Sequence, residues 1–462
     1  MILKPWPVPM KRPGLMLLAP CGSIDRTVTM QRLRDYQGST RTLLWVLLIV
    51  YIFNFLDRQI VNILAEPIAR DLKLSDTQLG LMTGLAFALL YTILGLPLAR
   101  YADKPASNRG KLIAVALATW SVMTALCGMA QNFVQLLLAR IGVGVGEAGC
   151  TPAAHSLIAD KVSPEKRPGA MAFYAMGIPI GTLLGSLIGG QLADTVGWRN
   201  AFLVVGLPGI LLAFVAWILI RDEDRPERIV APEQHAQSVR SAMWASIRQI
   251  WISIRELMKL KAYVLLLFAA SFCPFLAYGK ATWVTIFFQR THQLSPGEVG
   301  LWHGTASGIA AVFGTWLGGW LANRFGSVDR RHVVTAPAIG MVLAVPLAIL
   351  AFVQSDWRIA VALLLLPSIF NAFYYGPVYS SVQGLVPLHQ RAMASALLLF
   401  GQNLIGLGLG PLFFGILSDW LKPEYGSESV RYVLYGAALL GLIPAVLFWI
   451  ARPHLHAELD KH

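Results

Sequence analysis

Long apolar stretches, separated by short polar ones, fill most of the chain between about residues 41 and 451. A helix needs roughly 20 mostly apolar residues to cross a bilayer. Twelve windows meet this requirement, near residues 41–65, 77–99, 111–130, 133–158, 168–192, 201–220, 262–289, 299–322, 333–353, 358–383, 392–418 and 430–451. The pattern therefore predicts an all-α membrane protein with 12 transmembrane helices.

Landmark residues recur in the same order in the two parts of the chain, about 225 positions apart. Pro152 corresponds to Pro377, and Arg167 corresponds to Arg391. Further matches are Gly190, Leu192 and Asp194 with Gly415, Leu417 and Asp419, and Ala99, Ala102, Asp103 and Lys104 with Gly319, Ala322, Asn323 and Arg324. Several ordered matches at nearly one offset indicate two related six-helix halves, an organisation typical of secondary transporters.

The remaining segments complete the predicted domain organisation. Residues 1–40 are polar and interrupted by prolines, which predicts a mobile cytoplasmic tail before the first half at 41–220. A linker at 221–261 contains apolar residues at steps of three and four among basic ones, which predicts an amphipathic helix on the inner membrane surface. The second half covers 262–451, and residues 452–462 form a cytoplasmic tail.

Composition and charge agree with a membrane protein. Hydrophobic residues make up 56% of the chain and charged residues only 14%. If both termini are cytoplasmic, most of the 38 lysines and arginines fall on the cytoplasmic side, as the positive-inside rule requires. The net charge of +13 then reflects topology and contact with anionic lipids, with no nucleic acid involved. The four cysteines are scattered, which predicts neither a disulfide framework nor a metal site.

Several motifs resemble the signature sequences of the major facilitator superfamily. They are Arg140, Gly144 and Gly146 on the fourth span, Asp103, Lys104 and Arg109 after the second, and Asn323 and Arg324 after the eighth. The resemblance covers residues 41–451 and implies that these residues control the conformational change, with Arg140 fixing the fourth span. Two departures concern the loop motifs: Ala99 replaces the usual first glycine, and Asn323 replaces an aspartate.

Four polar residues inside predicted spans narrow the resemblance. Asn54, Asp57 and Arg58 on the first span, with Glu147 on the fourth, look like the Spinster-like branch of the superfamily. This likeness implies transport of a lysolipid or sphingolipid, coupled to protons. The likeness implies no cofactor. We expect the protein to be a monomer in the cell membrane, specifically the inner membrane of a bacterium.

Ionised side chains inside a membrane are costly and are therefore functional candidates. Burial favours the neutral form of a carboxyl group, and a nearby cation favours its ionised form. We therefore expect Asp57, Arg58 and Glu147 to couple proton uptake to movement, with Arg58 exchanging between the neighbourhood of Asp57 and Glu147. The alternative is a static ion pair that only fixes the helices.

Lys280 lies at nearly the same place in the seventh span as Asp57 in the first, at an offset of 223. A cation beside aromatic rings suits an anionic head group with an apolar tail. The predicted binding residues are therefore Lys280, Asn54, Tyr278, Trp283, Tyr374 and Tyr375. Two alternatives are that the lysine extends toward the outer interface and that the aromatic residues serve helix packing.

Other classes of function fit the sequence less well. Lys111 and Lys280 lack the glycine-rich context of a phosphate-binding loop, which excludes an ATP-driven pump. An intramembrane enzyme would need a nucleophile or metal ligands beside Asp57 and Glu147, and the sequence indicates neither. The alternatives to a lipid substrate are a small organic anion, such as a sugar acid, and a drug. The many aromatic and few buried polar residues favour the lipid.

Overall fold

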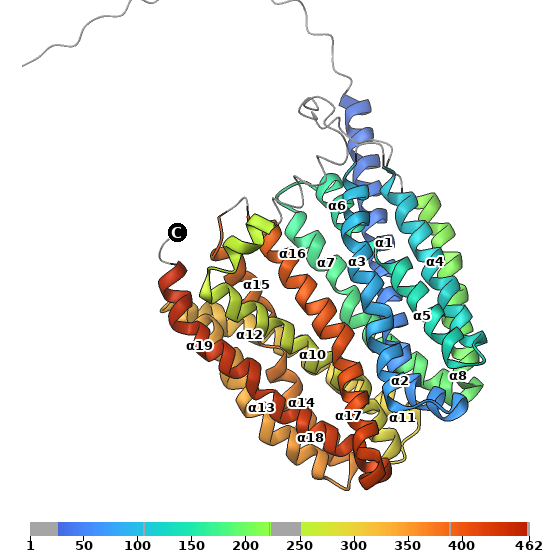
Figure 1. The fold of residues 1–462 in the computed structure, drawn as a ribbon. Coiled ribbons are helices and arrows are strands. Elements are labelled where there is room, and N and C mark those ends of the chain that lie inside the picture. Colours follow the sequence, from blue (N-terminus) through green and yellow to red (C-terminus); the bar gives the residue numbers. More distant parts are fainter. Residues whose placement is uncertain (1–25, 105–106, 221, 223–250, 388–389, 460–462) are drawn as a thin grey trace, which may run out of the picture.

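The computed structural model describes residues 26–104, 107–220, 222, 251–387 and 390–459, and every regular element among them is a helix. The first half contains α1 (Arg26–Leu72), α2 (Asp76–Gly80), η1 (Leu81–Leu85), α3 (Ala86–Asp103), α4 (Arg109–Met129), α5 (Phe133–Glu147), α6 (Cys150–Lys161), α7 (Arg167–Ala175) and α8 (Gly177–Leu219). Figure 1 shows these helices, from blue to green, packed as one group.

The second group, from yellow to red in Figure 1, lies beside the first. It contains α10 (Lys261–Arg290), α11 (Pro296–Val299), η2 (Gly300–Gly304), α12 (Thr305–Gly326), η3 (Arg330–Val334), α13 (Thr335–Val353), α14 (Trp357–Asn371), α15 (Tyr375–Gly384), α16 (Arg391–Gly401), η5 (Gln402–Leu409), α17 (Gly410–Tyr425), η6 (Gly426–Glu428), α18 (Ser429–Leu440) and α19 (Leu442–Leu459).

In the described part of the chain, 9 helical segments are long and apolar enough to cross a membrane. Two of them, Gly169–Leu219 with 51 residues and Met393–Glu458 with 66, exceed the length of one crossing. In the first, the backbone leaves helical geometry at Gly197, where φ is +79°, a conformation that glycine adopts readily. The division into twelve spans stays a prediction.

Two predicted spans are broken near their middle. The fourth span ends its first helix at Glu147 and resumes at Cys150, and the tenth ends at Asn371 and resumes at Tyr375. The repeated prolines Pro152 and Pro377 each lie a few residues after the break. Because proline has no backbone N–H, it cannot donate a hydrogen bond to the preceding turn of the helix. The internal repeat therefore places an equivalent break in each half, one at a carboxylate and the other at a pair of tyrosines.

The two halves contact each other at one end, where α2 packs against α17 and α11 packs against α8 (Figure 1). All hydrogen bonds that the described residues make between halves join segments toward this end. Close approach is allowed by glycine: a Cβ on Gly84 would lie 2.6 Å from the carbonyl oxygen of Gly408. We call this region the closed end.

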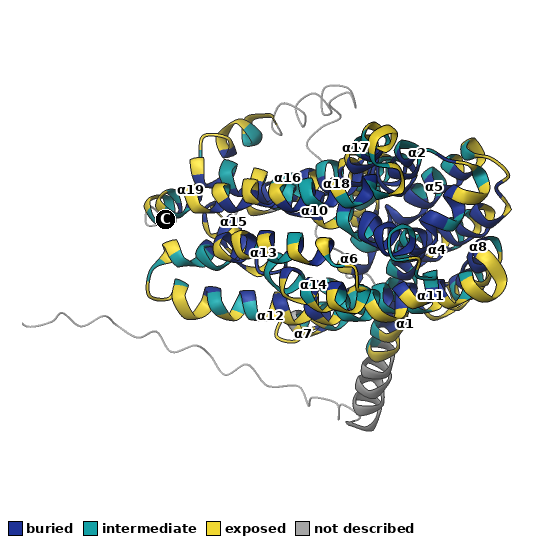
Figure 2. Ribbon diagram, turned by 90° about the horizontal axis from the view of Figure 1, so that it is seen from below, coloured by how far each residue is buried: buried dark blue, intermediate teal, exposed yellow. Residues whose placement is uncertain are grey.

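Many helices have one face of buried residues and another of exposed residues (Figure 2). The described residues form three buried apolar clusters, the largest of which draws on helices of both halves. Large apolar side chains such as Leu211, Phe214 and Trp316 are more than half exposed. In a helical protein with spans of this length, such an apolar outer surface is suited to contact with lipid.

The structure differs from the sequence prediction near the amino terminus and in the linker. Helix α1 already begins at Arg26, so residues 26–40 are helical where the sequence predicted a mobile tail. Its other end is Leu72, beyond the predicted boundary at 65. Of the predicted amphipathic linker helix, residues 251–257 are helical, and residues 223–250 lie outside the described part.

Candidate functional site

An ion pair inside the first half forms the centre of the candidate site. Both Nε and Nη2 of Arg58, on α1, lie 2.7 Å from Oε2 of Glu147. The Glu147 side chain is fully buried, and that of Arg58 is 15% exposed. Because Glu147 is the last residue of α5 before the break, the pair joins the long first helix to the point where the fourth span is interrupted.

Aromatic rings surround the guanidinium group of Arg58. Its Cζ atom lies 4.7 Å from the ring centroids of both Phe87 and Tyr91, and 5.2 Å from that of Phe55. Such rings attract a cation through their π-electron faces, and the attraction grows where water is excluded. The charge on Arg58 is therefore stabilised by more than its carboxylate partner.

Asp57, the neighbour of Arg58 in sequence, has a separate environment. Its Oδ2 atom accepts a hydrogen bond of 2.7 Å from Thr124 of α4. Oδ1 of Asp57, Oε1 of Glu147, Oδ1 of Asn54, and Nε and Nη1 of Arg140 are buried without a hydrogen-bond partner in the described part of the chain. This cluster of unsatisfied polar atoms is unusual for an interior, where nearly all such groups are paired.

The motif glycines bring these helices together. A Cβ on Gly144 would lie 2.4 Å from the carbonyl oxygen of Phe87, and one on Gly146 would lie 2.6 Å from the backbone nitrogen of Trp120. Neither position tolerates a larger residue without movement. The glycines of α5 therefore hold Phe87 of α3 close to both Arg58 and Arg140, whose Cζ lies 5.6 Å from the same ring.

The second half contributes aromatic and cationic groups. Lys280 of α10 is half-buried and has no ion-pair or hydrogen-bond partner among the described residues. Tyr278 is half-buried and interacts electrostatically with Arg58 of the other half. Tyr374 is buried and stacks on Tyr375 with a centroid distance of 4.3 Å, while Tyr375 is 43% exposed.

Trp283 has a different position from the one expected. Its side chain is fully buried, and its Nε1 donates a 3.0 Å hydrogen bond to the carbonyl oxygen of Pro411. This tryptophan therefore packs α10 against α17. The sequence suggested a binding role because Trp283 is close to Lys280 in the chain and three positions along a helix keep two residues on one face. Spacing along one helix does not show that α17 covers the indole.

The loop-motif residues differ in burial. Arg109 is fully buried and bonds to Asp222 through its backbone nitrogen at 2.7 Å, Nε at 2.9 Å and Nη2 at 2.6 Å. Its Nη1 also bonds to Asp160 at 2.5 Å and Ser156 at 2.9 Å. The other four motif residues are exposed at helix ends: Asp103, Lys104, Asn323 and Arg324.

A second charged network lies at the closed end. Arg290 of α10 makes two hydrogen bonds of 2.8 Å to the carboxylate of Asp76 and one of 2.6 Å to Glu66. Ser418 of α17 donates to Asp76 at 2.7 Å. Sequence reasoning missed this network, because its residues lie at the polar margins of the predicted spans, where charges are common.

Comparison with known proteins identifies the family. The family model described as Major Facilitator Superfamily matches residues 47–301 and 267–461. The chain belongs to the Major Facilitator Superfamily. It is therefore a multi-pass membrane transporter. This confirms the resemblance predicted from the motifs around Arg140 and Asp103.

Individual relatives include Spinster-like proteins. The chain is 33% identical to "MFS-type efflux pump" of Mycolicibacterium smegmatis, over 90% of this chain and 93% of that protein. It is 24% identical to "Protein spinster homolog 1" of Xenopus tropicalis, over 90% and 82% respectively. A crystal structure of a bacterial homolog of the human lysosomal transporter Spinster, inward-facing and unoccupied, superposes with a TM-score of 0.80 and 29% identity, covering 91% and 98%.

Proposed function

We propose that this protein is a proton-coupled secondary transporter that moves an amphiphilic, anionic, lipid-like substrate by alternating access. The observation that carries the proposal is the ion pair between Arg58 and Glu147, buried at the break in the fourth span. A buried pair of this kind is destabilised strongly when one partner loses its charge. Protonation of Glu147 therefore destabilises this arrangement of the surrounding helices and favours a different one.

The geometry supports a role for the proton at Glu147. Only Oε2 is bonded to Arg58, and Oε1 has no partner among the described residues. A proton can therefore add to Oε1 without displacing an existing hydrogen bond. Neutralisation of Glu147 leaves Arg58 without its counter-ion, and its aromatic neighbours then hold a cation that can pair with an anionic substrate.

The substrate class follows from groups in both halves. Arg58 interacts electrostatically with Tyr278 across the interface between the halves, and Lys280 lies two residues farther along α10 without a carboxylate partner in the described part. A cation bordered by aromatic rings, as Arg58 is, suits a phosphate or carboxylate head group with an apolar tail, and Lys280 adds a second cation in the other half. The relationship to Spinster-like proteins supports the same class of substrate.

Orientation completes the proposal. We place the closed end on the outer side and both termini in the cytoplasm, so that the halves would open toward the cytoplasm in this conformation. The distribution of lysine and arginine supports this orientation, as does the likeness to an inward-facing structure.

The test is uptake of a labelled lysophospholipid by proteoliposomes, with and without an imposed pH gradient. We expect wild type to respond to the gradient and Glu147→Gln to lose at least about tenfold of the gradient-driven flux, because glutamine keeps hydrogen bonding but cannot take up a proton. Glu298→Gln is the matched control: Glu298 lies in a capping box whose counterpart in the first half already contains Gln78. Equal flux in wild type and Glu147→Gln would support a static ion pair instead.

Drug efflux is the second candidate, favoured by the 33% identity to an efflux pump. The same proteoliposomes distinguish the two. Gradient-driven movement of a cationic amphiphilic dye, without movement of the lysolipid, would support efflux and contradict the anionic substrate. Movement of a sugar acid alone would contradict both.

A further inference from the structure

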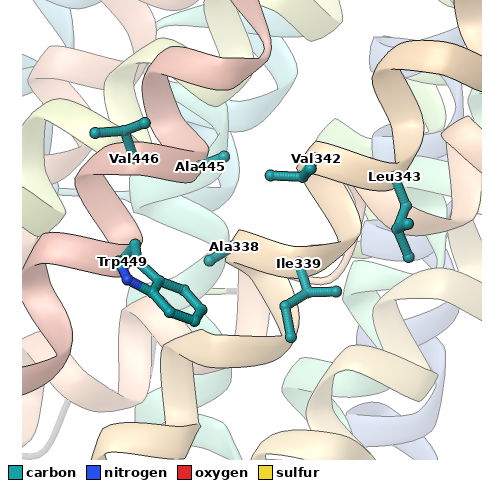
Figure 3. Close-up of a pocket in the computed structure, with 7 residues that line it drawn as sticks. All are labelled: Ala338, Ile339, Val342, Leu343, Ala445, Val446 and Trp449. Carbon is teal, nitrogen blue, oxygen red and sulfur yellow. The ribbon is translucent and has the colours of Figure 1, made fainter.

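An apolar groove lies between α13 and α19, on the outer surface of the second half. It has a volume of about 250 Å³. Figure 3 shows Ala338, Ile339 and Val342 of α13 on one side, and Val446 and Trp449 of α19 on the other. The volume is close to that of the smallest ligand pockets, about 300 Å³.

The groove faces the surroundings of the helix bundle. Val342 is 49% exposed, Val446 54% and Trp449 53%. Both bordering helices belong to segments long and apolar enough to span a membrane. An open apolar groove on such a surface is filled by the hydrocarbon that surrounds it, and in a bilayer that hydrocarbon is the acyl chain of a lipid.

One end of the groove carries a cation. The Cζ atom of Arg452 lies 4.2 Å from the ring centroid of Trp449, one turn farther along α19. Nε of Arg452 is buried and has no hydrogen-bond partner among the described residues. The guanidinium group is thus held against Trp449, which borders the groove.

Two described carboxylates on or beside the end of α19 have other partners. Asp329 lies within ion-pair distance of His456, at 3.8 Å, and of Arg331, at 3.9 Å. Glu458 accepts hydrogen bonds from the backbone nitrogens of Lys261 and Ala262. Among the described residues, Arg452 makes no ion pair, so it places a positive charge beside the tryptophan that borders the groove, and a guanidinium group suits a phosphate.

We infer that this groove is a binding site for an anionic phospholipid of the bilayer, with one acyl chain between α13 and α19 and the head-group phosphate at Arg452. The site is separate from Arg58, Glu147 and Lys280, so it binds a resident lipid and not the transported substrate. Its occupancy would stabilise the packing of α19 against α13.

The experiment measures the melting temperature of the purified protein in detergent while phosphatidylglycerol is added, with phosphatidylcholine of the same chains for comparison. We expect phosphatidylglycerol to raise the melting temperature of wild type more than phosphatidylcholine does. Arg452→Gln should require about fivefold more phosphatidylglycerol for the same shift. Val342→Trp, which fills the groove from its exposed side, should reduce the response to both lipids.

Two controls match these variants. Arg358→Gln removes another arginine stacked on a tryptophan, Trp357, away from the groove. Val312→Trp enlarges a valine that is 52% exposed on α12. Equal stabilisation of wild type by the two lipids would overturn the inference, as would a response of Arg452→Gln or Val342→Trp equal to that of its control.

Discussion

Among the described residues, the carboxylate of Asp57 accepts a hydrogen bond from one side chain, the hydroxyl of Thr124. We expect Thr124→Val to reduce gradient-driven transport about tenfold, because a buried charged group that loses its hydrogen bond is destabilised by roughly 1–3 kcal/mol. The measurement is the ratio of flux with and without the pH gradient in proteoliposomes. A merely structural effect would lower both fluxes together.

Thr124→Ser provides the control for that prediction. Serine keeps the hydroxyl and removes only a methyl group, so it should keep the gradient response that valine reduces. If serine and valine behave alike, the methyl group and its packing matter, and the hydrogen bond to Asp57 does not.

Arg109 provides a test of stability instead of coupling. Arg109→Ala leaves the buried Asp222 and the half-buried Asp160 facing each other without their shared cation. Removal of one partner from a buried pair costs about 3–5 kcal/mol. We expect a melting temperature lower by several degrees, measured by the fluorescence of the purified protein on heating, while Arg324→Ala, at an exposed position, changes it little.

At the same scale, the sequence located charged residues better than their partners. Asp57, Arg58 and Glu147 stand out because they interrupt apolar spans, whereas Thr124 has no such signal in a membrane helix. Asp160 and Asp222 lie outside the spans, where acidic residues are common. That both of them face Arg109 depends on the folding of three separate segments, and no spacing rule provides that information.

At the scale of helices, the closed end is built from two equivalent contacts. Asp194, at the end of the fifth span, accepts from the backbone nitrogen of Gly297 at 3.0 Å and from Ser295. Its repeat partner Asp419 accepts from the backbone nitrogens of Asp76 and Thr77 at 3.0 and 2.7 Å. Each aspartate thus caps the start of a helix in the opposite half.

We expect Asp194→Ala and Asp419→Ala each to favour opening of this end. Loss of one cap costs about 1 kcal/mol, which increases the open population about fivefold. The two sites belong to different contacts, so the effects should add in the double variant. The measurement is electron–electron double resonance, which gives the distribution of distances between two spin labels. The labels are placed at residues 131 and 355, one in a loop of each half.

Asp356→Ala is the matched control, because Asp356 caps α14 within its own half through the backbone nitrogen of Arg358. It should leave the distance distribution unchanged. An equal shift in this control, or no shift in Asp194→Ala, would contradict a role of the two aspartates in joining the halves.

Helix boundaries show what a hydropathy pattern can and cannot predict. The apolar windows fall on long helices, but each window averages over about 20 residues and hides a break of two or three. The breaks after Glu147 and Asn371 were missed for this reason. The repeated pair Pro152 and Pro377 carried the signal, since proline disfavours the interior of a helix.

At the scale of the whole molecule, the repeat in the sequence predicted two related halves, and the family match confirms the superfamily. The repeat alone is symmetric, so it cannot say at which end the halves meet. That choice depends on contacts such as Arg290 with Asp76, which join residues more than 200 positions apart. Such contacts distinguish one conformation of the same fold from another.

Alternating access requires the closed end to open during each cycle. Thr77→Cys and Lys422→Cys would place thiols on α2 and α17, where the original Lys422 Nζ lies 3.8 Å from Asp76. In a Cys21→Ser background, a short, cleavable bifunctional thiol reagent should join the halves and reduce lysolipid transport to the background rate. Cleavage should restore it. The three cysteines in the described part of the chain, Cys127, Cys150 and Cys273, are buried, which limits their reaction.

The pair Glu428→Cys and Arg431→Cys serves as the control, because both residues lie in the second half, three positions apart. Cross-linking there should leave transport unchanged. Transport that continues with residues 77 and 422 cross-linked would mean that the substrate passes without separation of α2 and α17, and it would contradict rocking of the two halves about the Arg58–Glu147 site. Loss of transport only when residues 77 and 422 are cross-linked would show that each transport cycle requires opening of the closed end.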